Sequence, residues 1–307
     1  MQARRRTVLV VGATGQQGGA VARLLSKRGH TVRALTRNPD SASSLALQNL
    51  GVTVMKGELN DSESVQRASK GVDAAFVMST PMKEAGGIMK DGGLDAEIHE
   101  AINAIEAVQT AGVKHLIYSS VASADENTGI PHFDSKYKVE EYIRQNVKIP
   151  YTIVAPATFM ENYSSPPLSG AIAQGKLVMP LPSSRKLQHV ALNDFAGVVA
   201  KILESPLESF SGKRIEVASD ELSLSEVAKT LTEVLGRSVE YNELPLQIAR
   251  SAIGDDLAKM FEWFSTTGYS VNISELKDKN PEVVWHNFRE WARSHDWHNL
   301  LTVKSNA

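Results

Sequence analysis

The chain of 307 residues contains no cysteine. This absence excludes disulfide bonds, thiolate nucleophiles and cysteine-ligated zinc, and it fits a reducing compartment. No run of the sequence approaches the roughly 18 apolar residues that a membrane span requires. The short apolar run that follows the N-terminal arginines leads into glycines and glutamines rather than into a cleavage site. We therefore expect a cytoplasmic protein that does not enter a membrane.

An excess of charge of one sign is also absent. The formal net charge is -2, and the basic clusters are short: Arg4, Arg5 and Arg6 near the start, and Arg185 and Lys186 later. Because nucleic-acid binding usually needs a concentrated positive face, direct binding of nucleic acid is not expected. Hydrophobic residues make up 42% and charged residues 22% of the chain, which is ordinary for a compact globular protein.

Strand and helix patterns alternate through the first half of the chain. Helices are expected after the first glycines, near 96–111 and at 136–145. This alternation predicts an α/β fold with a doubly wound parallel sheet of the Rossmann type. The expected strands are 7–11, 31–36, 52–55, 74–78, 115–118, 151–155 and a last one at 215–218.

The rhythm changes after Pro156, where prolines become frequent. We expect a smaller C-terminal lobe that caps the substrate at the carboxyl edge of the sheet, where α/β proteins bind ligands. The predicted division assigns 1–155, completed by about 186–220, to an NADP(H)-binding domain, and 156–185 and 221–307 to the capping lobe.

Two helices of this lobe carry start signals. Ser223 and Glu226 are spaced as a capping box for a helix that reaches Leu235. Asn280 precedes Pro281, a residue that suits the first turn, so a helix is expected from Pro281 to Ala292.

The stretch VVGATGQQGG, residues 10–19, places Gly12, Gly15 and Gly18 at a strand-to-helix turn. Glycines permit a tight turn and let backbone N–H groups approach a pyrophosphate at the positive end of the following helix. The flanking strand and helix stand where this mechanism needs them, so the motif predicts dinucleotide binding. The alternative is a glycine turn needed only for packing.

The end of the second expected strand bears on the choice of dinucleotide. An acidic residue about 20 residues after the glycine loop would bind the ribose 2′-OH of NAD. The chain instead has Thr36, Arg37 and Asn38. Arg37 can hold a 2′-phosphate through bidentate, charge-assisted hydrogen bonds and can stack on adenine. NADP(H) is therefore favoured over NAD(H), and the alternative is an exposed arginine without this role.

Several stretches resemble the NmrA-like group of atypical short-chain dehydrogenases/reductases, within the NAD(P)-binding Rossmann superfamily. They are VLVVGATGQQGG at 8–19, TRN at 36–38, the stretch 54–61, IYSSVAS at 117–123, HFDSKYKVEEYIR at 132–144, APATFMENY at 155–163 and LQHVALNDFAGVVAKIL at 187–203. Some members are NADPH-dependent oxidoreductases of quinones or other small carbonyl compounds, and others are redox sensors that bind NADP without turning it over. The resemblance implies a reductase of a small carbonyl, quinone or enone substrate, or alternatively a non-catalytic NADP(H) sensor that regulates a protein partner.

The resemblance also implies where a cofactor would lie. The glycine loop would line the pyrophosphate, Arg37 the 2′-phosphate, and Lys136 would bond the nicotinamide ribose. Many relatives have Asp at the position of Glu58, so this chain departs from the family there. The implied cofactor positions are Gly12, Thr14, Gly15, Gln16, Gln17, Gly18, Arg37, Asn38, Gly57, Glu58, Met78, Ser79, Ser119, Lys136, Pro156, Ala157, Thr158 and Phe159.

Typical reductases of the wider superfamily use a Tyr-x-x-x-Lys motif with an upstream serine. Lysine lowers the pKa of the tyrosine, so that the phenol can give a proton to a carbonyl. In this chain His132 stands four residues before Lys136. Histidine can act as a general acid, so His132, Lys136 and Ser120 are the catalytic candidates. The alternative for His132 is a loop histidine with structural hydrogen bonds. The alternative for Ser120 is a polar strand end that satisfies nearby backbone groups.

Two further features concern a metal and a lid. His295, Asp296 and His298 are too few ligands to predict a metal site, and none is expected. The stretch EAGGIMKDGG at 84–93 is expected to be a lid over the nicotinamide or a mobile connection. The sequence leaves the oligomeric state open.

Overall fold

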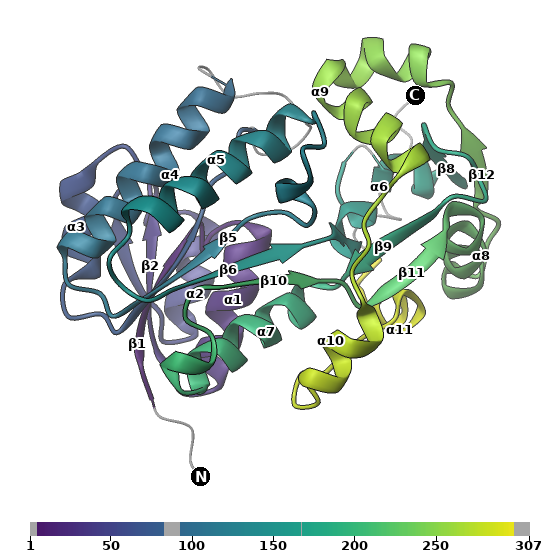
Figure 1. The fold of residues 1–307 in the computed structure, drawn as a ribbon. Helices are drawn as coiled ribbons and strands as arrows, with labels where there is room; N and C mark the ends of the chain where they lie inside the picture. Colours follow the sequence, from purple (N-terminus) through teal and green to yellow (C-terminus); the bar gives the residue numbers. More distant parts are fainter. Residues whose placement is uncertain (1–4, 83–92, 167, 298–307) are drawn as a thin grey trace.

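The computed structural model describes residues 5–82, 93–166 and 168–297 (Figure 1). Residues 83–92 are not among them, so the lid expected at 84–93 lies outside the described residues except for Gly93, which begins a helix.

Within the described residues, seven parallel strands form the central sheet in the order β10-β6-β5-β4-β1-β2-β3. They are β1 (Thr7–Val11), β2 (Thr31–Thr36), β3 (Thr53–Lys56), β4 (Ala74–Met78), β5 (His115–Ser119), β6 (Tyr151–Pro156) and β10 (Lys213–Val217). Val8 of β1 pairs with Val32 on one side and with Ala74 on the other, so the strand order reverses at β1. The crevice outside the carboxyl ends of such strands is where α/β proteins bind ligands. The predicted doubly wound α/β fold is confirmed.

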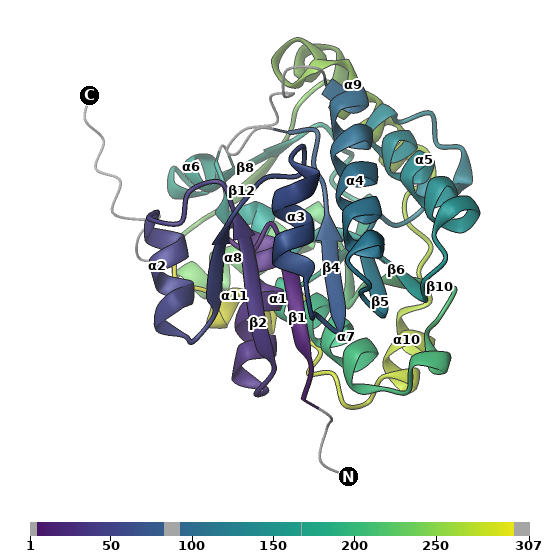
Figure 2. The same ribbon diagram turned by 90° about the vertical axis from the view of Figure 1, so that its left-hand side faces the viewer.

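Helices cover both faces of this sheet (Figures 1 and 2). α1 (Gln16–Lys27) and α7 (Leu192–Glu204) pack on one face, and α2 (Ala42–Asn49) contributes to the same core. The other face carries α3 (Ser62–Ser69), α4 (Gly93–Thr110) and α5 (Pro131–Asn146). Because side chains alternate along a strand, Val8 and Val10 enter the first core, whereas Leu9 and Val11 enter the second.

Most of the remaining elements build a smaller lobe, to the right of the sheet in Figure 1, around a third, aromatic-rich core. β7 (Thr158–Phe159), β9 (Lys186–Val190) and β11 (Asp220–Ser223) form one small sheet, and β8 (Lys176–Met179) pairs with β12 (Glu240–Glu243). The lobe also contains α6 (Leu168–Ala173), α8 (Leu224–Leu235), α9 (Leu246–Thr266), α11 (Phe288–Ser294) and the 3-10 turn η2 (Met160–Ser164). α10 (Ile273–Lys279) packs through Leu276 on the same core as α1 and α7. The 3-10 turns η1 (Ala124–Glu126) and η3 (Leu207–Ser209) follow β5 and α7 in the chain.

The capping residues in the sequence predicted one helix start correctly and another wrongly. The capping box of Ser223 and Glu226 is present at the start of α8, as predicted. The helix expected from 281 to 292 is wrong, because Asn280 accepts a turn hydrogen bond from Val283 and α11 begins only at Phe288. α5 begins at Pro131 rather than at the expected residue 136. His132 therefore lies in the first turn of a helix, not in a loop.

Candidate functional site

A cavity of about 340 Å³ lies between the carboxyl ends of β4, β5 and β6 and the smaller lobe. Residues of the sheet edge, the first turn of α1, α5 and β7 form one wall: Gln17, Met78, Ser79, Thr80, Ser119, Ser120, Val121, His132, Phe133, Lys136, Pro156, Ala157, Thr158 and Phe159. The smaller lobe forms the other wall with Asn162, Tyr163, Leu168, Met179, Leu187, Met260, Phe261, Phe264 and Tyr269. The structure thus gathers the residues predicted near a nicotinamide into one hollow.

The glycine loop borders this cavity through Gln17, whose amide donates to the Ser119 hydroxyl at 2.6 Å. Gly12 has a φ of +70°, and a Cβ at Gly18 would lie 2.4 Å from the carbonyl oxygen of Gly12, so both glycines serve the turn itself. A Cβ at Gly15 would meet that oxygen only at 3.4 Å. Packing alone therefore does not require a glycine at position 15.

The N-terminus of α1 suits an anion. Its N-cap residue is Gly15, which has no side chain to cap the helix, and its first turn contains no acidic residue. α3 and α8 differ, because Asp61 and Ser223 accept from N–H groups of their first turns. Uncapped N–H donors at the positive end of a helix dipole favour a phosphate group, so these residues fit a dinucleotide pyrophosphate.

The residues predicted near the adenosine end lie where β2 and β3 finish. Arg37 and Glu58 are exposed, and Gly57 donates from its N–H to the carbonyl of Thr36 at 2.9 Å. A Cβ at Gly57 would lie 2.6 Å from the Ser64 hydroxyl, so packing accounts for this glycine. Asn38 accepts from the N–H of Asp40 and so shapes the turn after β2.

Lys136 is held by a buried polar cluster from β4, α4 and α5. Its Nζ lies 2.7 Å from Oε1 of Glu97 and 3.2 Å from the Ser79 hydroxyl, and it also donates to the Ser79 carbonyl. Ser135 donates to the other oxygen of Glu97 at 2.6 Å. The side chain of Glu97 is fully buried and that of Lys136 is 12% exposed. A cation at the cavity wall therefore has its own internal carboxylate.

His132 has a different carboxylate partner, contributed by the smaller lobe. Its Nδ1 forms a short contact with Oδ1 of Asp256 on α9, and the two side chains are 18% and 16% exposed. The ring also packs edge-on against Phe133, with 4.9 Å between ring centroids. His132 and Lys136 are separated by one turn of α5, and both line the cavity.

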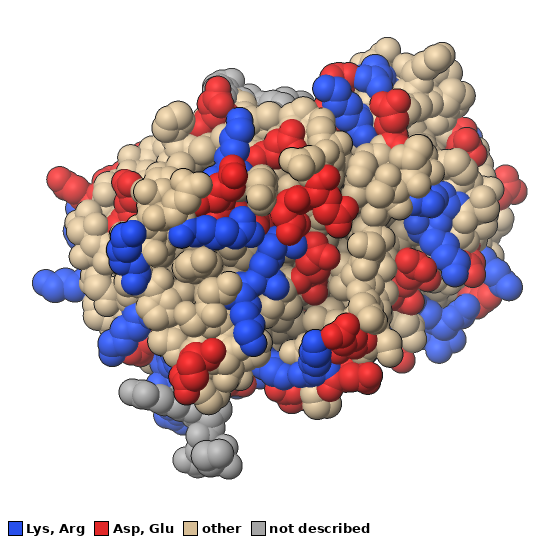
Figure 3. Space-filling view, viewed as in Figure 1, with Lys and Arg blue, Asp and Glu red and all other residues tan. Residues whose placement is uncertain are grey.

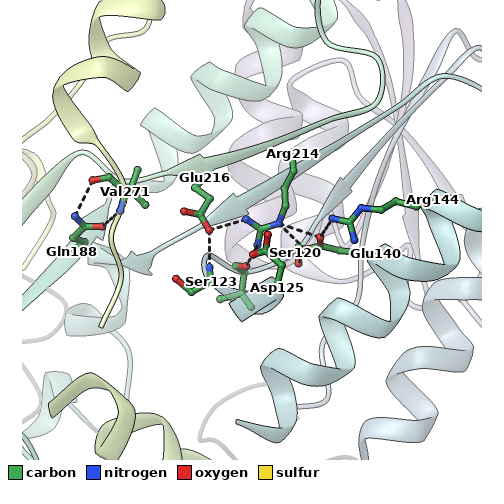
Figure 4. A network of polar contacts seen from close by, with 10 residues as sticks. Ser120, Ser123, Asp125, Glu140, Arg144, Gln188, Arg214, Glu216 and Val271 are labelled. Carbon is green, nitrogen blue, oxygen red and sulfur yellow. Dashed lines mark hydrogen bonds and ion pairs between the residues drawn. The ribbon is translucent and has the colours of Figure 1, made fainter. Parts of the chain in front are cut away.

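The serine candidates are engaged within the protein. Ser119 accepts from Gln17, and the Ser120 hydroxyl donates to Glu140, which is fully buried (Figure 4). Glu140 also accepts from Arg144 and from Arg214 of β10. The hydrogen of Ser120 therefore points into a structural network rather than toward the cavity.

That network extends from Arg214 to the turn after β5 (Figure 4). Arg214 forms ion pairs with Asp125 at 3.0 Å and with Glu216 at 2.7 Å, and Glu216 accepts from the N–H of Ser123. Ser123 adopts a φ of 58°, in the left-handed region. Because each of these charges has a partner, the network fixes the end of β5 beside the cavity.

Other predicted features concern metals, membranes and surface charge. In the described part of the chain, no group of three or more His, Asp or Glu side chains is placed to hold a metal ion, and no helix is long and apolar enough to cross a membrane. His298 lies outside that part. Figure 3 shows lysine and arginine side chains interspersed with aspartate and glutamate over one face of the molecule.

Comparison with known proteins gives the family. The model of the NmrA-like family matches residues 4–293. The chain belongs to the NmrA-like family. It is 30% identical over 287 residues to the NmrA-like family domain-containing oxidoreductase FrzB of Cladobotryum sp, covering 85% of this chain and 84% of that protein.

Solved structures share the fold. The triphenylmethane reductase of Citrobacter sp. complexed with NADP(H) has a TM-score of 0.74 at 24% identity, covering 94% of this chain and 99% of that one. NmrA, a negative transcriptional regulator, in complex with NAD has a TM-score of 0.75 at 22% identity, covering 94% and 95%. Proteins that share this fold thus include one described as a reductase and one described as a transcriptional regulator.

Among the residues of the site that sequence reasoning missed, Glu97, Asp256 and Tyr269 bear on its polar chemistry. Glu97 carried a signal, since it is a carboxylate on the same helix face as Ala101, Ala104 and Val108, which are buried. Asp256 and Tyr269 carried none, because both come from the lobe: only the tertiary fold brings Asp256 against His132 and Tyr269 to the cavity. Burial raises the pKa of the Tyr269 phenol, and a hydrogen bond with Thr158 opposes that rise.

Proposed function

We propose that the chain is an NADP(H)-dependent reductase of a small, apolar carbonyl, quinone or enone. The cavity carries the proposal, because it adjoins the glycine loop, presents His132 and Lys136 from one helix, and is otherwise mainly apolar. Oxidoreductases among its relatives, and nucleotide cofactors in structures of the same fold, support it.

The residues suited to the cofactor follow the edge of the sheet. Gly15 and the first turn of α1 would hold the pyrophosphate, Arg37 the 2′-phosphate, and Pro156 to Phe159 would face the nicotinamide. Lys136 would meet the ribose, and because its ammonium already has three oxygen neighbours, the ribose must share or replace one of them. When bound, NADPH supplies a hydride to the substrate carbon. The preference for NADP(H) depends on Arg37.

His132 is the proton donor in this proposal. The hydrogen of Ser120 is directed to Glu140, whereas His132 lines the cavity beside the apolar surface where a substrate would lie. An imidazolium can donate its proton to a carbonyl oxygen as negative charge develops there. Tyr269 also borders the cavity and provides the alternative donor.

The smaller lobe supplies the substrate end of the cavity. Met260, Phe261 and Phe264 of α9, together with Tyr163 and Tyr269, present mainly apolar surface. Such a lining favours a flat or aliphatic substrate with one polar group directed toward α5. We therefore propose that 156–185 and 221–307 serve substrate capping and 1–155 with about 186–220 the cofactor. β9 is shared between the two, because its Leu187 lies in the core of the lobe and its Val190 in the first core.

The test is NADPH oxidation measured against a panel of quinones, enones and aldehydes, with His132→Gln and Tyr269→Phe as matched variants. We expect turnover with NADPH to exceed that with NADH, a large loss in His132→Gln and a small one in Tyr269→Phe. A large loss in Tyr269→Phe alone would transfer the role of donor to the phenol.

The alternative is a non-catalytic sensor that regulates a protein partner. It is favoured by the histidine at the usual tyrosine position and by the regulator NmrA among proteins of the same fold. Calorimetry with NADP+ and NADPH tests it, because a redox sensor must bind the two forms with different affinity. No turnover across the panel, together with unequal affinities, would replace the reductase by the sensor.

A further inference from the structure

Two helices from different parts of the fold bring their cavity-facing residues together at one ion pair. On α5, His132 and Lys136 both face the cavity, one turn apart. On α9, Asp256 stands four residues before Met260 and eight before Phe264, and these two residues line the same cavity. The contact between His132 and Asp256 therefore joins the sheet domain to the lobe at the cavity itself.

The pairing determines which nitrogen of His132 is available. Asp256 accepts at Oδ1 from Nδ1, so the neutral ring carries its proton on Nδ1 and has a lone pair on Nε2. The ring can then donate from Nε2 only as the imidazolium, which the carboxylate stabilises. In His–Asp pairs of hydrolases, the carboxylate has this same role of holding the tautomer and supporting the charge.

The two neighbouring aspartates of α9 have different surroundings. Asp255 is exposed and forms ion pairs with Arg250 and with Lys259. Asp256 is largely buried, and in the described part of the chain its Oδ2 has no hydrogen-bond partner. A buried carboxylate with a single partner is costly unless the partner can carry positive charge. The contact with His132, a side chain that can carry positive charge, therefore explains the position of Asp256.

The backbone directs Asp256 to this place. The helical path of α9 is interrupted at Gly254, with φ 83° and ψ 167°, so Asp256 lies in the first turn of the second helical segment. A carboxylate is favourable at a helix N-terminus, which is the purely structural explanation for an aspartate there. That explanation accounts for either aspartate, but it does not account for a side chain turned into the protein toward His132.

Other charges surround the pair. Burial raises the pKa of Asp134, two residues beyond His132 on α5. Asp256 also raises that pKa, whereas Lys138, His132 and Lys259 lower it. Lys136 is separately neutralised by Glu97. Lys136 and His132 thus each contact a carboxylate from another element, Glu97 of α4 and Asp256 of α9.

We propose that Asp256 is the positioning residue of the site, which holds His132 with Nε2 toward the substrate and stabilises the imidazolium that donates the proton. The proposal rests on the reductase function proposed above. When bound, NADPH would supply the hydride to the substrate carbon, and the electron pair of the C=O bond would move to oxygen. The proton passes from Nε2 of His132 to that oxygen, and the neutral ring regains a proton from solvent.

The test compares Asp256→Asn with Asp255→Asn, a matched control that removes the same charge one residue away. In Asp256→Asn we expect kcat to fall roughly 10- to 100-fold while KM and NADPH affinity stay unchanged, because the donor is misplaced rather than the substrate. Asp255→Asn should keep the kcat of the wild type. In a His132→Gln background, Asp256→Asn should have no further effect.

A second measurement does not need turnover. Long-range 1H–15N spectra of histidine-labelled protein report which nitrogen of neutral His132 is protonated. We expect Nδ1–H in the wild type and in Asp255→Asn, and a mixture or Nε2–H in Asp256→Asn, whose amide can turn and donate. The wild-type spectrum stands by itself if Asp256→Asn does not fold.

The outcomes separate the two proposals. An active wild type whose kcat is unaffected by Asp256→Asn overturns the role of Asp256 and leaves the reductase intact. A wild type that reduces no compound of the panel refutes the reductase function. The spectra then test only whether His132 and Asp256 are paired. Nε2–H in the wild type, or equal losses of kcat in the two aspartate variants, contradicts the positioning role.

Discussion

The Nζ atom of Lys136 lies 2.7 Å from Oε1 of Glu97, a fully buried carboxylate on the neighbouring helix α4. Removing one member of a buried pair leaves the other charge without compensation, which typically costs about 3–5 kcal/mol. The glutamine of Glu97→Gln can still accept hydrogen bonds from Ser79 and Ser135. We therefore expect the free energy of unfolding to fall by about 3 kcal/mol, at the lower end of that range, in urea titrations.

Glu106→Gln is the matched control for this prediction. Glu106 lies on the same helix and is exposed, where it accepts from the Tyr142 hydroxyl. Its replacement should change stability by no more than about 0.5 kcal/mol. Equal effects of the two substitutions would show that Lys136 does not depend on Glu97.

The glycine loop allows a sharp comparison of two substitutions three residues apart. Gly18→Ala would place a Cβ 2.4 Å from the backbone oxygen of Gly12, so the turn must shift and the protein should be destabilised. Gly15→Ala meets only an ordinary contact at 3.4 Å and should fold normally. Its methyl group would instead stand at the uncapped end of α1 and obstruct a pyrophosphate. Thermal unfolding together with calorimetry of NADPH binding separates the two effects; normal NADPH affinity in Gly15→Ala would contradict the proposed cradle.

Arg37 provides a test of cofactor choice. If its guanidinium holds the 2′-phosphate, Arg37→Ala removes a charge-assisted contact worth about 1.5–3 kcal/mol, or roughly a 10- to 100-fold loss of NADPH affinity. NADH has no 2′-phosphate, so its affinity should be nearly unchanged and serves as the internal control. A parallel loss for both nucleotides would place Arg37 on the adenine alone.

The agreement between sequence and structure depends on how local each signal is. The strands Thr7–Val11, Thr31–Thr36 and Ala74–Met78 were predicted with their observed bounds, because a short run rich in apolar and β-branched residues is a property of the strand itself. α9 was missed because Gly254 interrupts its helical period, which shifts the apolar face halfway along. The signals at Asn280 and Pro281 were real, but they serve a turn.

The candidate site shows the same division. The motif singled out His132 and Lys136, but the helix was expected to begin only at residue 136. The structure begins α5 at Pro131, which places both residues on one face of the helix. Their carboxylate partners could not be predicted from the sequence. Glu97 lies 39 positions from Lys136, and Asp256 lies 124 positions from His132. Only the packing of α4 and α9 against α5 brings them together.

Two buried histidines predict how stability depends on pH. Burial lowers the pKa of His115 and of His189 to about 4 each, and the nearby Arg6 adds to the effect at His115. In the unfolded chain both should titrate near 6.5. As pH falls below about 6.5, the unfolded state binds protons that the folded state excludes, so stability is lost down to about pH 4. Burial raises the pKa of Glu161 and Asp194, which opposes this loss.

The contribution of one histidine to this pH dependence is therefore measured as the difference between the wild type and a variant that lacks it. His189→Gln should lower stability at every pH, because the hydrogen bond between His189 and the Tyr163 hydroxyl, 2.9 Å long, is altered. From pH 7 to pH 4.5 the variant should nevertheless lose about 2 kcal/mol less than the wild type, since it lacks one titrating group. Urea unfolding at the two pH values measures both quantities. An identical loss in wild type and variant would mean that His189 is protonated in the folded protein, which its burial at 0% exposure opposes.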